Sequence, residues 1–173
     1  MKRLYLLRHA KTEQANKDTP TDALRVLTET GRRDAPKVGR AMRTRSYFPD
    51  LILCSPSART KQTLYLANAE LRSPALIEYA DTIYAAGASR LLALFRGLQN
   101  DVQAPLVVGH NPGFEDCAAL LISPEEALDR TFAGGNFPTS ALLVLNFEIG
   151  TWKELAPHIG TVVDFIRPKD LPD

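Results

Sequence analysis

The sequence predicts an α/β protein in which helices cover both faces of a mostly parallel sheet, a three-layer α/β/α sandwich. Short apolar runs alternate with segments of helical periodicity from the N-terminus to about residue 121. Two further apolar runs flank Gly150 and predict a hairpin, which would add an antiparallel edge strand. The length of 173 residues fits one domain, spanning residues 1–173.

The predicted strands are short apolar runs, each followed by polar residues or turn formers. A strand that is buried on both faces is expected to be continuously apolar, and Leu106-Val107-Val108 is the clearest example. The run after residue 74 is weaker. The predicted strands cover residues 3–7, 51–54, 75–79, 106–108, 141–147 and 152–156.

The predicted helices are marked by capping residues and apolar residues at helical spacing. Thr28, Ser57 and Ser123 are suitable N-caps, and Glu126 would complete a capping box with Ser123. Pro36 falls inside the first helical pattern, so a kink or a late start is expected there. The predicted helices cover residues 28–45, 58–71, 88–98, 114–121 and 123–129.

Three segments without periodicity are predicted to be irregular. Residues 10–26 are polar and form a longer loop than most connections, which is typical of functional loops. Residues 132–138 contain Gly134-Gly135 and form a second loop, and the tail 167–173 is polar with two prolines.

Composition and charge argue against several functional classes. Residues 1–60 carry a net charge of +7 and residues 61–173 carry −6. A basic third can mark an anionic ligand, although a solvated helix face explains much of it, and no nucleic-acid motif accompanies it. No apolar run approaches the roughly 20 residues that cross a bilayer, and no signal peptide is visible. We therefore expect a cytoplasmic protein with no nucleic-acid or membrane partner.

The two cysteines do not form a disulfide framework. Cys54 and Cys117 each lie among apolar residues, so reduced, buried thiols are expected. Ser55-Pro56 follows Cys54 in place of a glycine-rich loop whose amides stabilise a thiolate, which argues against a catalytic cysteine.

Residues that suit a phosphate group follow three of the predicted strands. Arg8-His9 follows the first, Ser55 to Thr60 with Arg59 follows the second, and Gly109-His110-Asn111 follows the fourth. Ligands of open α/β sheets lie beyond the carboxyl ends of the strands. Each segment alone has an ordinary structural explanation, such as a packed histidine or a turn. Together, two arginines and two histidines at one sheet edge predict a phosphate site.

These segments resemble the motifs of the histidine phosphatase (phosphoglycerate mutase-like) superfamily. Arg8-His9-Ala10 is similar to its Arg-His-Gly signature, although Ala10 replaces the glycine. Residues 55–63, residues 108–112 and Leu27-Thr28-Glu29-Thr30-Gly31 resemble its second-arginine, second-histidine and helix-start motifs. The short chain, the sequence Arg-His-Ala-Lys and Thr139-Ser140-Ala141 resemble the compact SixA-type phosphohistidine phosphatases.

The resemblance implies a phosphoglycerate mutase-like fold and a role for each matching residue. His9 would attack phosphorus and form a phosphohistidine, while Arg8, Arg59 and His110 would hold the equatorial oxygens. Asn111 and Lys11 are assigned to substrate binding. No cofactor or metal is expected, because the arginines supply the positive charge. A di-histidine metal site is the competing hypothesis, but the chain has only three histidines and no i, i+4 pair.

The general acid is the least defined part of the predicted site. The resemblance favours Asp81, with Glu78 as a second candidate, and the long first loop offers Glu13, Asp18 and Asp22. A weak or missing acid suits a labile P–N bond better than an alkyl phosphate, because a protonated imidazole leaves more easily than an alkoxide.

The sequence therefore predicts a metal-independent phosphatase that acts on a phosphohistidine protein, such as a phosphotransfer domain. A small-molecule phosphomonoesterase and a phospho-ligand binding module of the same fold are the alternatives. Mutase action is not expected, because the short insertions leave little to shield the intermediate from water.

Overall fold

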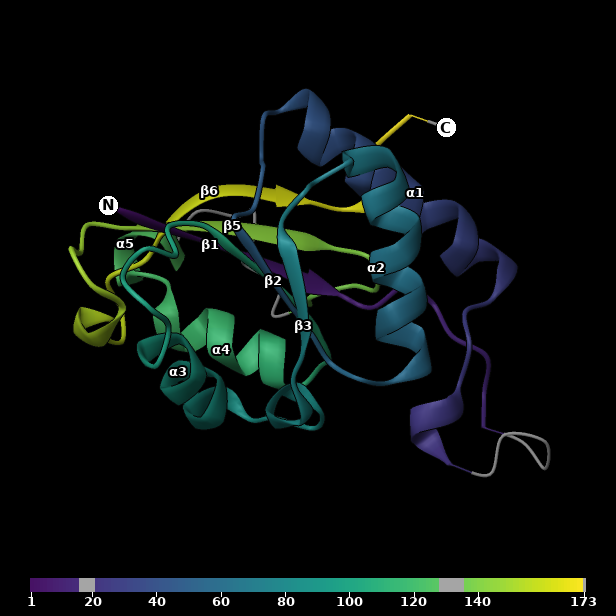
Figure 1. The fold of residues 1–173 in the computed structure, drawn as a ribbon, viewed down its shortest axis with the longest axis horizontal. Helices are drawn as coiled ribbons and strands as arrows, with labels where there is room; N and C mark the ends of the chain where they lie inside the picture. Colours follow the sequence, from purple (N-terminus) through teal and green to yellow (C-terminus); the bar gives the residue numbers. More distant parts are fainter. Residues whose placement is uncertain (16–20, 128–135, 173) are drawn as a thin grey trace.

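The computed structural model describes residues 1–15, 21–127 and 136–172, and its centre is a six-stranded sheet (Figure 1). The order across the sheet is β3-β2-β4-β1-β5-β6. β4 pairs in parallel with β1 and β2, β3 is parallel to β2, and β5 is antiparallel to β1 and β6. The strands are β1 (Lys2–Arg8), β2 (Leu51–Cys54), β3 (Leu76–Tyr79), β4 (Pro105–Gly109), β5 (Leu142–Phe147) and β6 (Thr161–Ile166).

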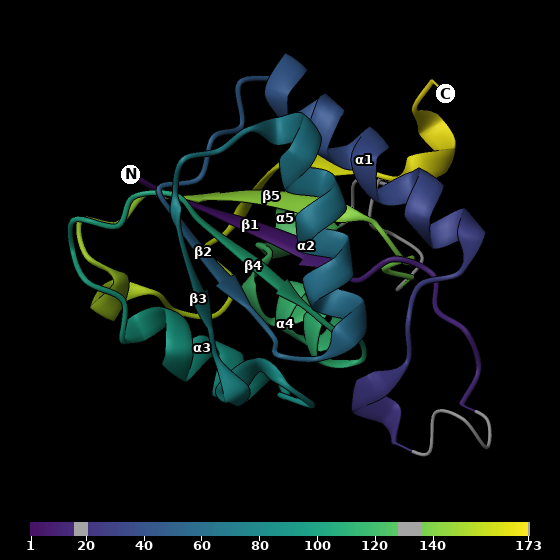
Figure 2. The same ribbon diagram turned by 45° about the vertical axis from the view of Figure 1, so that its right-hand side comes forward.

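Helices cover both faces of this sheet, so the predicted three-layer architecture is confirmed (Figures 1 and 2). One face carries α1 (Glu29–Thr44) and α2 (Ala58–Leu71), and the other carries α3 (Ala88–Arg96) and α4 (Gly113–Leu121). The short helix α5 (Pro124–Ala127) follows α4. No helix within the described ranges is long and apolar enough to span a bilayer.

The central strand β1 divides the core between the two helical layers. Leu4 and Leu6 pack with the apolar side chains of α3 and α4, whereas Tyr5 and Leu7 pack with those of α1 and α2. All four side chains are buried. The alternation follows from the two-residue period of a strand, and it explains why a strand covered on both faces reads as a continuous apolar run.

The register of the three central strands brings the predicted site segments together. Arg8 of β1 lies opposite Gly109 of β4, and Cys54 of β2 lies opposite Val108 of the same strand. Because β4 lies between β1 and β2, the residues that follow all three strands emerge at one edge of the sheet.

The predicted strand at 152–156 is wrong. Trp152–Glu154 forms a 3-10 turn, and the partner of β5 in the hairpin is β6, Thr161–Ile166. The Trp152 indole is buried and donates a hydrogen bond to the Val102 carbonyl at 2.8 Å. Glu154 accepts from the Thr151 backbone N–H at 2.9 Å and closes the turn. The sequence signal of β6 was weak because most of this edge strand is only partly buried.

The helix predictions need smaller corrections. α1 continues through Pro36 from a start at Glu29, so the late start is wrong, because the Thr28 hydroxyl caps the helix by accepting from the Gly31 N–H at 3.1 Å. The tail contains one 3-10 turn, Pro168–Asp170. Among the predicted features, the end of the helix at residue 129, the Glu126 side chain, Asp18 and Gly134-Gly135 lie outside the described residues.

Candidate active site

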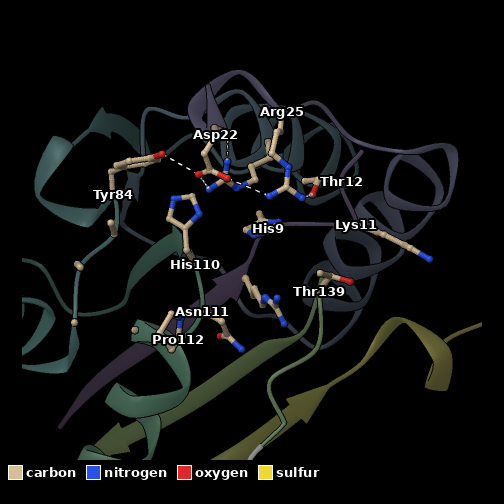
Figure 3. A pocket seen from close by; sticks show the side chains of 16 residues that line it. His9, Lys11, Thr12, Asp22, Arg25, Tyr84, His110, Asn111, Pro112 and Thr139 are labelled. Atoms are coloured by element: carbon tan, nitrogen blue, oxygen red, sulfur yellow. Dashed lines mark hydrogen bonds and ion pairs between the residues drawn. The ribbon is translucent and has the colours of Figure 1, made fainter. Parts of the chain in front are cut away.

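A pocket of about 540 Å³ lies at the edge of the sheet where β1 and β4 end (Figure 3). Its floor is formed by Arg8 at the end of β1 and His9 directly after it, by Arg59 in the first turn of α2, and by His110 after β4. The first loop and residues 84–87 form its other walls. These four residues come from three separate segments of the chain, and the fold brings them together, as the sequence predicted.

His9 is a neutral imidazole with one nitrogen free. Its Nδ1 atom lies 2.8 Å from the Ala10 carbonyl oxygen, which can only accept, so Nδ1 carries the proton and Nε2 keeps its lone pair. Burial and, to a smaller extent, the charges of Arg59, Arg8 and Arg25 lower the pKa of His9 to about 4, although the hydrogen bond to Ala10 opposes this shift. At neutral pH His9 is therefore in the form that can act as a nucleophile.

His110 lies beside His9, with 5.4 Å between the ring centroids. Its Nε2 atom is 2.7 Å from the Ser55 hydroxyl, and its Nδ1 atom is buried with no partner among the described residues. Burial, followed by the charge of Arg59, lowers the pKa of His110 to about 3. When the Ser55 hydroxyl donates to Nε2, the proton of the neutral ring is on Nδ1 and is available to a ligand.

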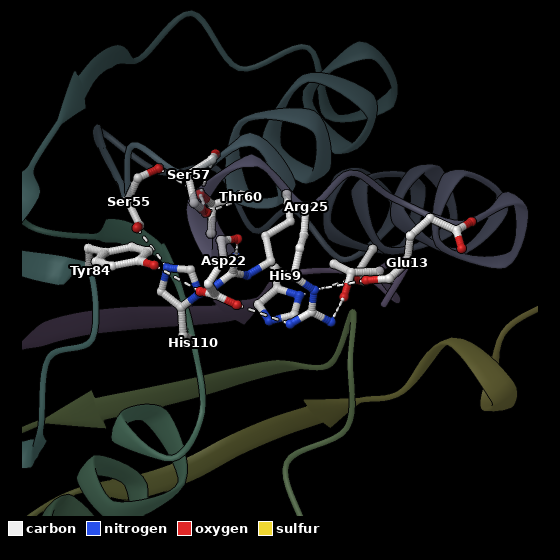
Figure 4. A network of polar contacts seen from close by, with 12 residues as sticks. His9, Glu13, Asp22, Arg25, Ser55, Ser57, Thr60, Tyr84 and His110 are labelled. Atoms are coloured by element: carbon white, nitrogen blue, oxygen red, sulfur yellow. Dashed lines mark hydrogen bonds and ion pairs between the residues drawn. The ribbon is translucent and has the colours of Figure 1, made fainter. Parts of the chain in front are cut away.

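The two arginines are each anchored along one edge of the guanidinium. Arg8 donates from Nη1 to the Phe137 carbonyl at 2.6 Å. Arg59 donates from Nη1 to the Asp22 carbonyl at 2.6 Å and from Nη2 to the Asp22 carboxylate at 2.7 Å (Figure 4). The Nε atoms of both arginines are buried and have no partner among the described residues.

Unpaired buried donors define the chemistry of the pocket. Buried polar groups normally have partners, so the Nε atoms of Arg8 and Arg59 indicate a missing acceptor. Two guanidinium groups and an imidazole N–H suit an anion with several oxygens. Across the described residues no three His, Cys, Asp or Glu side chains form a group that could hold a metal ion.

Known proteins share both the motifs and the fold. A model of the histidine phosphatase superfamily (branch 1) matches residues 4–80. The structure of a protein from Agrobacterium tumefaciens, assigned as the phosphohistidine phosphatase SixA, superposes with a TM-score of 0.80 and is 33% identical, covering 96% of this chain and 98% of that one. The chain belongs to the histidine phosphatase superfamily.

Two other relatives also match over most of the chain. A Nakamurella multipartitia protein with the same assignment is 29% identical, with a TM-score of 0.79 and 96% of both chains covered. An uncharacterized protein of Mycobacterium tuberculosis is 32% identical over 165 residues, 94% of this chain and all of that protein. Members of the superfamily are generally phosphatases, and several of the matching solved structures are phosphatases by name.

Among the described residues, Asp22 is the carboxylate that lines the pocket (Figure 4). It accepts from Arg59, from Arg25 Nη1 at 3.1 Å and from the Tyr84 hydroxyl at 2.8 Å. Partial burial alone would raise the pKa of Asp22, but the hydrogen bonds from Tyr84, Arg59 and Arg25 outweigh it and hold the pKa well below its usual range. Asp22 is therefore ionised at neutral pH.

The remaining predicted site residues are in different positions. Lys11 and Asn111 line the pocket, but Asn111 Nδ2 already donates to Glu115 at 2.8 Å and to the Phe137 carbonyl at 3.1 Å. Asp81 is exposed in a 3-10 turn and is absent from the pocket lining, and Glu78 is exposed on β3. Among the candidates for an acid within the described residues, only Asp22 lines the pocket.

Sequence reasoning missed two residues of the outer wall, Arg25 and Tyr84. Arg25 donates to the Thr12 hydroxyl at 2.6 Å and pairs with Asp22, while the Tyr84 ring lies edge-on to His110 with 5.5 Å between centroids. Arg25 follows Asp22 by three residues, and this spacing could have indicated an ion pair between them. Nothing in the local pattern around Tyr84 marked it.

Two motif residues hold the loop after His9 in place. Thr63 accepts from the Ala10 N–H at 2.9 Å and donates to the Arg59 carbonyl at 2.6 Å, so it joins the loop to the first turn of α2. Gly31 packs directly on the same loop, because a Cβ atom there would lie 2.3 Å from the Lys11 carbonyl oxygen. Thr63, four residues after the motif arginine, and Gly31 of the helix-start motif are therefore both needed to position this loop.

Proposed function

We propose that the protein is a metal-independent phosphatase that transfers a phosphoryl group to His9 and then to water. The observation that carries this proposal is the free Nε2 atom of His9 in a pocket with unpaired buried donors on Arg8, Arg59 and His110. A phosphoryl group satisfies those donors with its equatorial oxygens, while Nε2 approaches phosphorus in line with the leaving group.

The proposed reaction has two displacements at phosphorus. In the first, the Nε2 lone pair forms the N–P bond as the bond from phosphorus to the leaving group breaks, and the Ala10 carbonyl holds the proton on Nδ1. In the second, a water oxygen attacks phosphorus, the N–P bond breaks and neutral His9 returns with inorganic phosphate. The guanidinium groups stabilise the charge on the phosphoryl oxygens in both steps.

We further propose that the substrate is a phosphohistidine in a protein, such as a phosphotransfer domain. The support is the ionised state of Asp22, because a carboxylate with a depressed pKa is a poor proton donor at neutral pH. A phosphohistidine ring takes its proton from water and leaves as neutral imidazole, whereas an alkoxide needs an acid. The phosphohistidine phosphatase assignment of the Agrobacterium and Nakamurella relatives supports the same substrate class.

The test is covalent trapping combined with a substrate panel. Wild-type protein and His9→Ala are given radiolabelled phosphohistidine peptide, p-nitrophenyl phosphate and a sugar phosphate, then quenched in alkali. We expect an alkali-stable, acid-labile label on wild-type protein alone, with the phosphohistidine peptide turned over fastest. Wild-type turnover by a folded His9→Ala protein would overturn the nucleophile assignment. Equal rates on the sugar phosphate would indicate a small-molecule phosphatase.

A further inference from the structure

A chain of hydrogen bonds connects Arg8 to Glu115 through Phe137 and Asn111. The Phe137 carbonyl accepts from Arg8 Nη1 at 2.6 Å and also from Asn111 Nδ2 at 3.1 Å. The same Nδ2 atom donates to Glu115 Oε2 at 2.8 Å. One carbonyl oxygen therefore joins an arginine at the end of β1 to a side chain at the start of α4.

The orientation of the Asn111 amide in this chain is fixed by its partners. A backbone carbonyl and a carboxylate can only accept, so the NH₂ side of the amide has to face both of them. The Oδ1 atom is left buried without a partner among the described residues. Both amide hydrogens are thus used within the protein, and Asn111 has no donor left for a phosphoryl group.

The Phe137 carbonyl is held in place by the core. The Phe137 ring is fully buried and packs edge-on against Phe114 of α4, with 6.0 Å between centroids, and against Phe165 of β6, at 5.4 Å. A carbonyl on such an anchored residue is a rigid acceptor, and it fixes the Nη1 edge of the Arg8 guanidinium. The opposite Nε atom is the buried donor without a partner.

The charge of Glu115 also acts on Arg8. Burial lowers the pKa of Arg8, and Glu115 opposes this shift. Glu115 lies in the first turn of α4, one turn after Asn111, and its side chain is partly buried. Asp116 lies beside it in the same turn but is exposed. The two acids share the favourable end of the helix dipole, but of the two it is Glu115 that accepts a hydrogen bond from Asn111.

We propose that Glu115 is a positioning residue for phosphoryl transfer, acting through Asn111 and the Phe137 carbonyl to orient the guanidinium of Arg8. Glu115 touches neither the phosphoryl group nor His9. Its carboxylate orients the amide of Asn111, and this amide shares the Phe137 carbonyl with Arg8, which lines the pocket. This inference rests on the proposed phosphatase function.

The experiment compares Glu115→Ala with Asp116→Ala as a matched control, and Glu115→Gln as the conservative variant. Steady-state turnover of p-nitrophenyl phosphate, orthovanadate affinity and Tm are measured for each. For Glu115→Ala we expect kcat/KM and vanadate affinity to fall about tenfold, because a misaligned guanidinium weakens oxyanion contacts. Glu115→Gln keeps an acceptor for Asn111 and is expected to recover to within about threefold of wild type.

The control separates positioning from helix stability. Asp116→Ala removes a first-turn acid from α4 and is expected to lower Tm without changing kcat/KM or vanadate affinity. The inference is overturned if Glu115→Ala keeps wild-type values, or if Asp116→Ala loses as much as Glu115→Ala. A wild-type protein without turnover contradicts the proposed function instead, and the vanadate measurements then still decide the role of Glu115.

Discussion

The two walls of the pocket differ in how their charges are compensated. On the sheet side, Arg8, His9 and His110 are held by the ends of β1 and β4, and the exposed fractions of the two histidines are only 9% and 7%. On the loop side, the Asp22 side chain is 51% exposed and its charge is shared between Arg25 and Arg59. The sheet side keeps unpaired donors, whereas the loop side largely neutralises itself.

This contrast indicates that the two walls have different roles. The sheet side is preorganised for an oxyanion, because its donors are buried and fixed before a ligand arrives. The loop side sets which leaving groups are acceptable, since its carboxylate is already ionised. Arg59 shares features of both, because its Nη atoms bind Asp22 while its buried Nε atom has no partner among the described residues.

The largest effect is expected from Arg59→Lys. A lysine keeps the charge but loses the planar fork, so it cannot hold Asp22 and a phosphoryl oxygen at the same time. We expect kcat/KM for p-nitrophenyl phosphate to fall about 100-fold, as for loss of an oxyanion donor. The matched control is Arg25→Lys on the loop side, where a loss below about fivefold is expected for an exposed pair. Similar losses for the two variants would contradict the distinction between the walls.

The second prediction concerns pH and the sheet-side histidines. Their pKa values are lowered by burial to about 4 for His9 and about 3 for His110, whereas an unfolded histidine titrates near 6.5. Below pH 6.5 the unfolded chain therefore binds protons that the folded protein does not bind. The free energy of unfolding is therefore independent of the protonation of these two histidines above pH 6.5, and it decreases as the pH falls toward 4.

Urea denaturation between pH 7 and pH 4.5 measures this dependence, with His110→Asn as the variant. The decrease in stability with falling pH should be shallower in the variant, which lacks one of the two buried rings. An NMR titration of His9 follows the same property directly. A midpoint near 6.5 in the folded protein would show that the sheet side is open to water.

The smallest effect is expected from Asp22→Asn on the loop side. Neutralising the carboxylate removes a charge that competes for Arg59, so inorganic phosphate should inhibit roughly three- to tenfold more strongly. Turnover of p-nitrophenyl phosphate should change little, because a phenolate leaves without an acid. Tyr84→Phe removes one hydrogen bond to Asp22 without changing its charge and is the control. A loss of about 100-fold in the turnover of an alkyl phosphate by Asp22→Asn, with turnover of p-nitrophenyl phosphate unchanged, would identify Asp22 as the proton donor.

Features set by local patterns could be predicted from the sequence, whereas features set by contacts between distant residues could not. The apolar runs of β1, β2 and β4 were identified because burial on both faces leaves no polar alternation. The 3-10 turn at Trp152 was misjudged because its capping bonds and the indole bond to Val102 outweighed a strand-like composition. Tyr84 was missed because its role depends on contacts with residues 62 and 26 positions away.

The sequence by itself determined the sheet with two helical layers and the four residues of the pocket floor, Arg8, His9, Arg59 and His110. These depend on local patterns and on the rule that parallel strands end at one edge. Only the tertiary structure decided which acid enters the pocket, and it placed Asp22 there and Asp81 outside. The physical reason is that hydrogen bonds from Arg59 and Tyr84, which lie 37 and 62 positions away in the chain, select Asp22 and lower its pKa, and no local pattern encodes such an encounter.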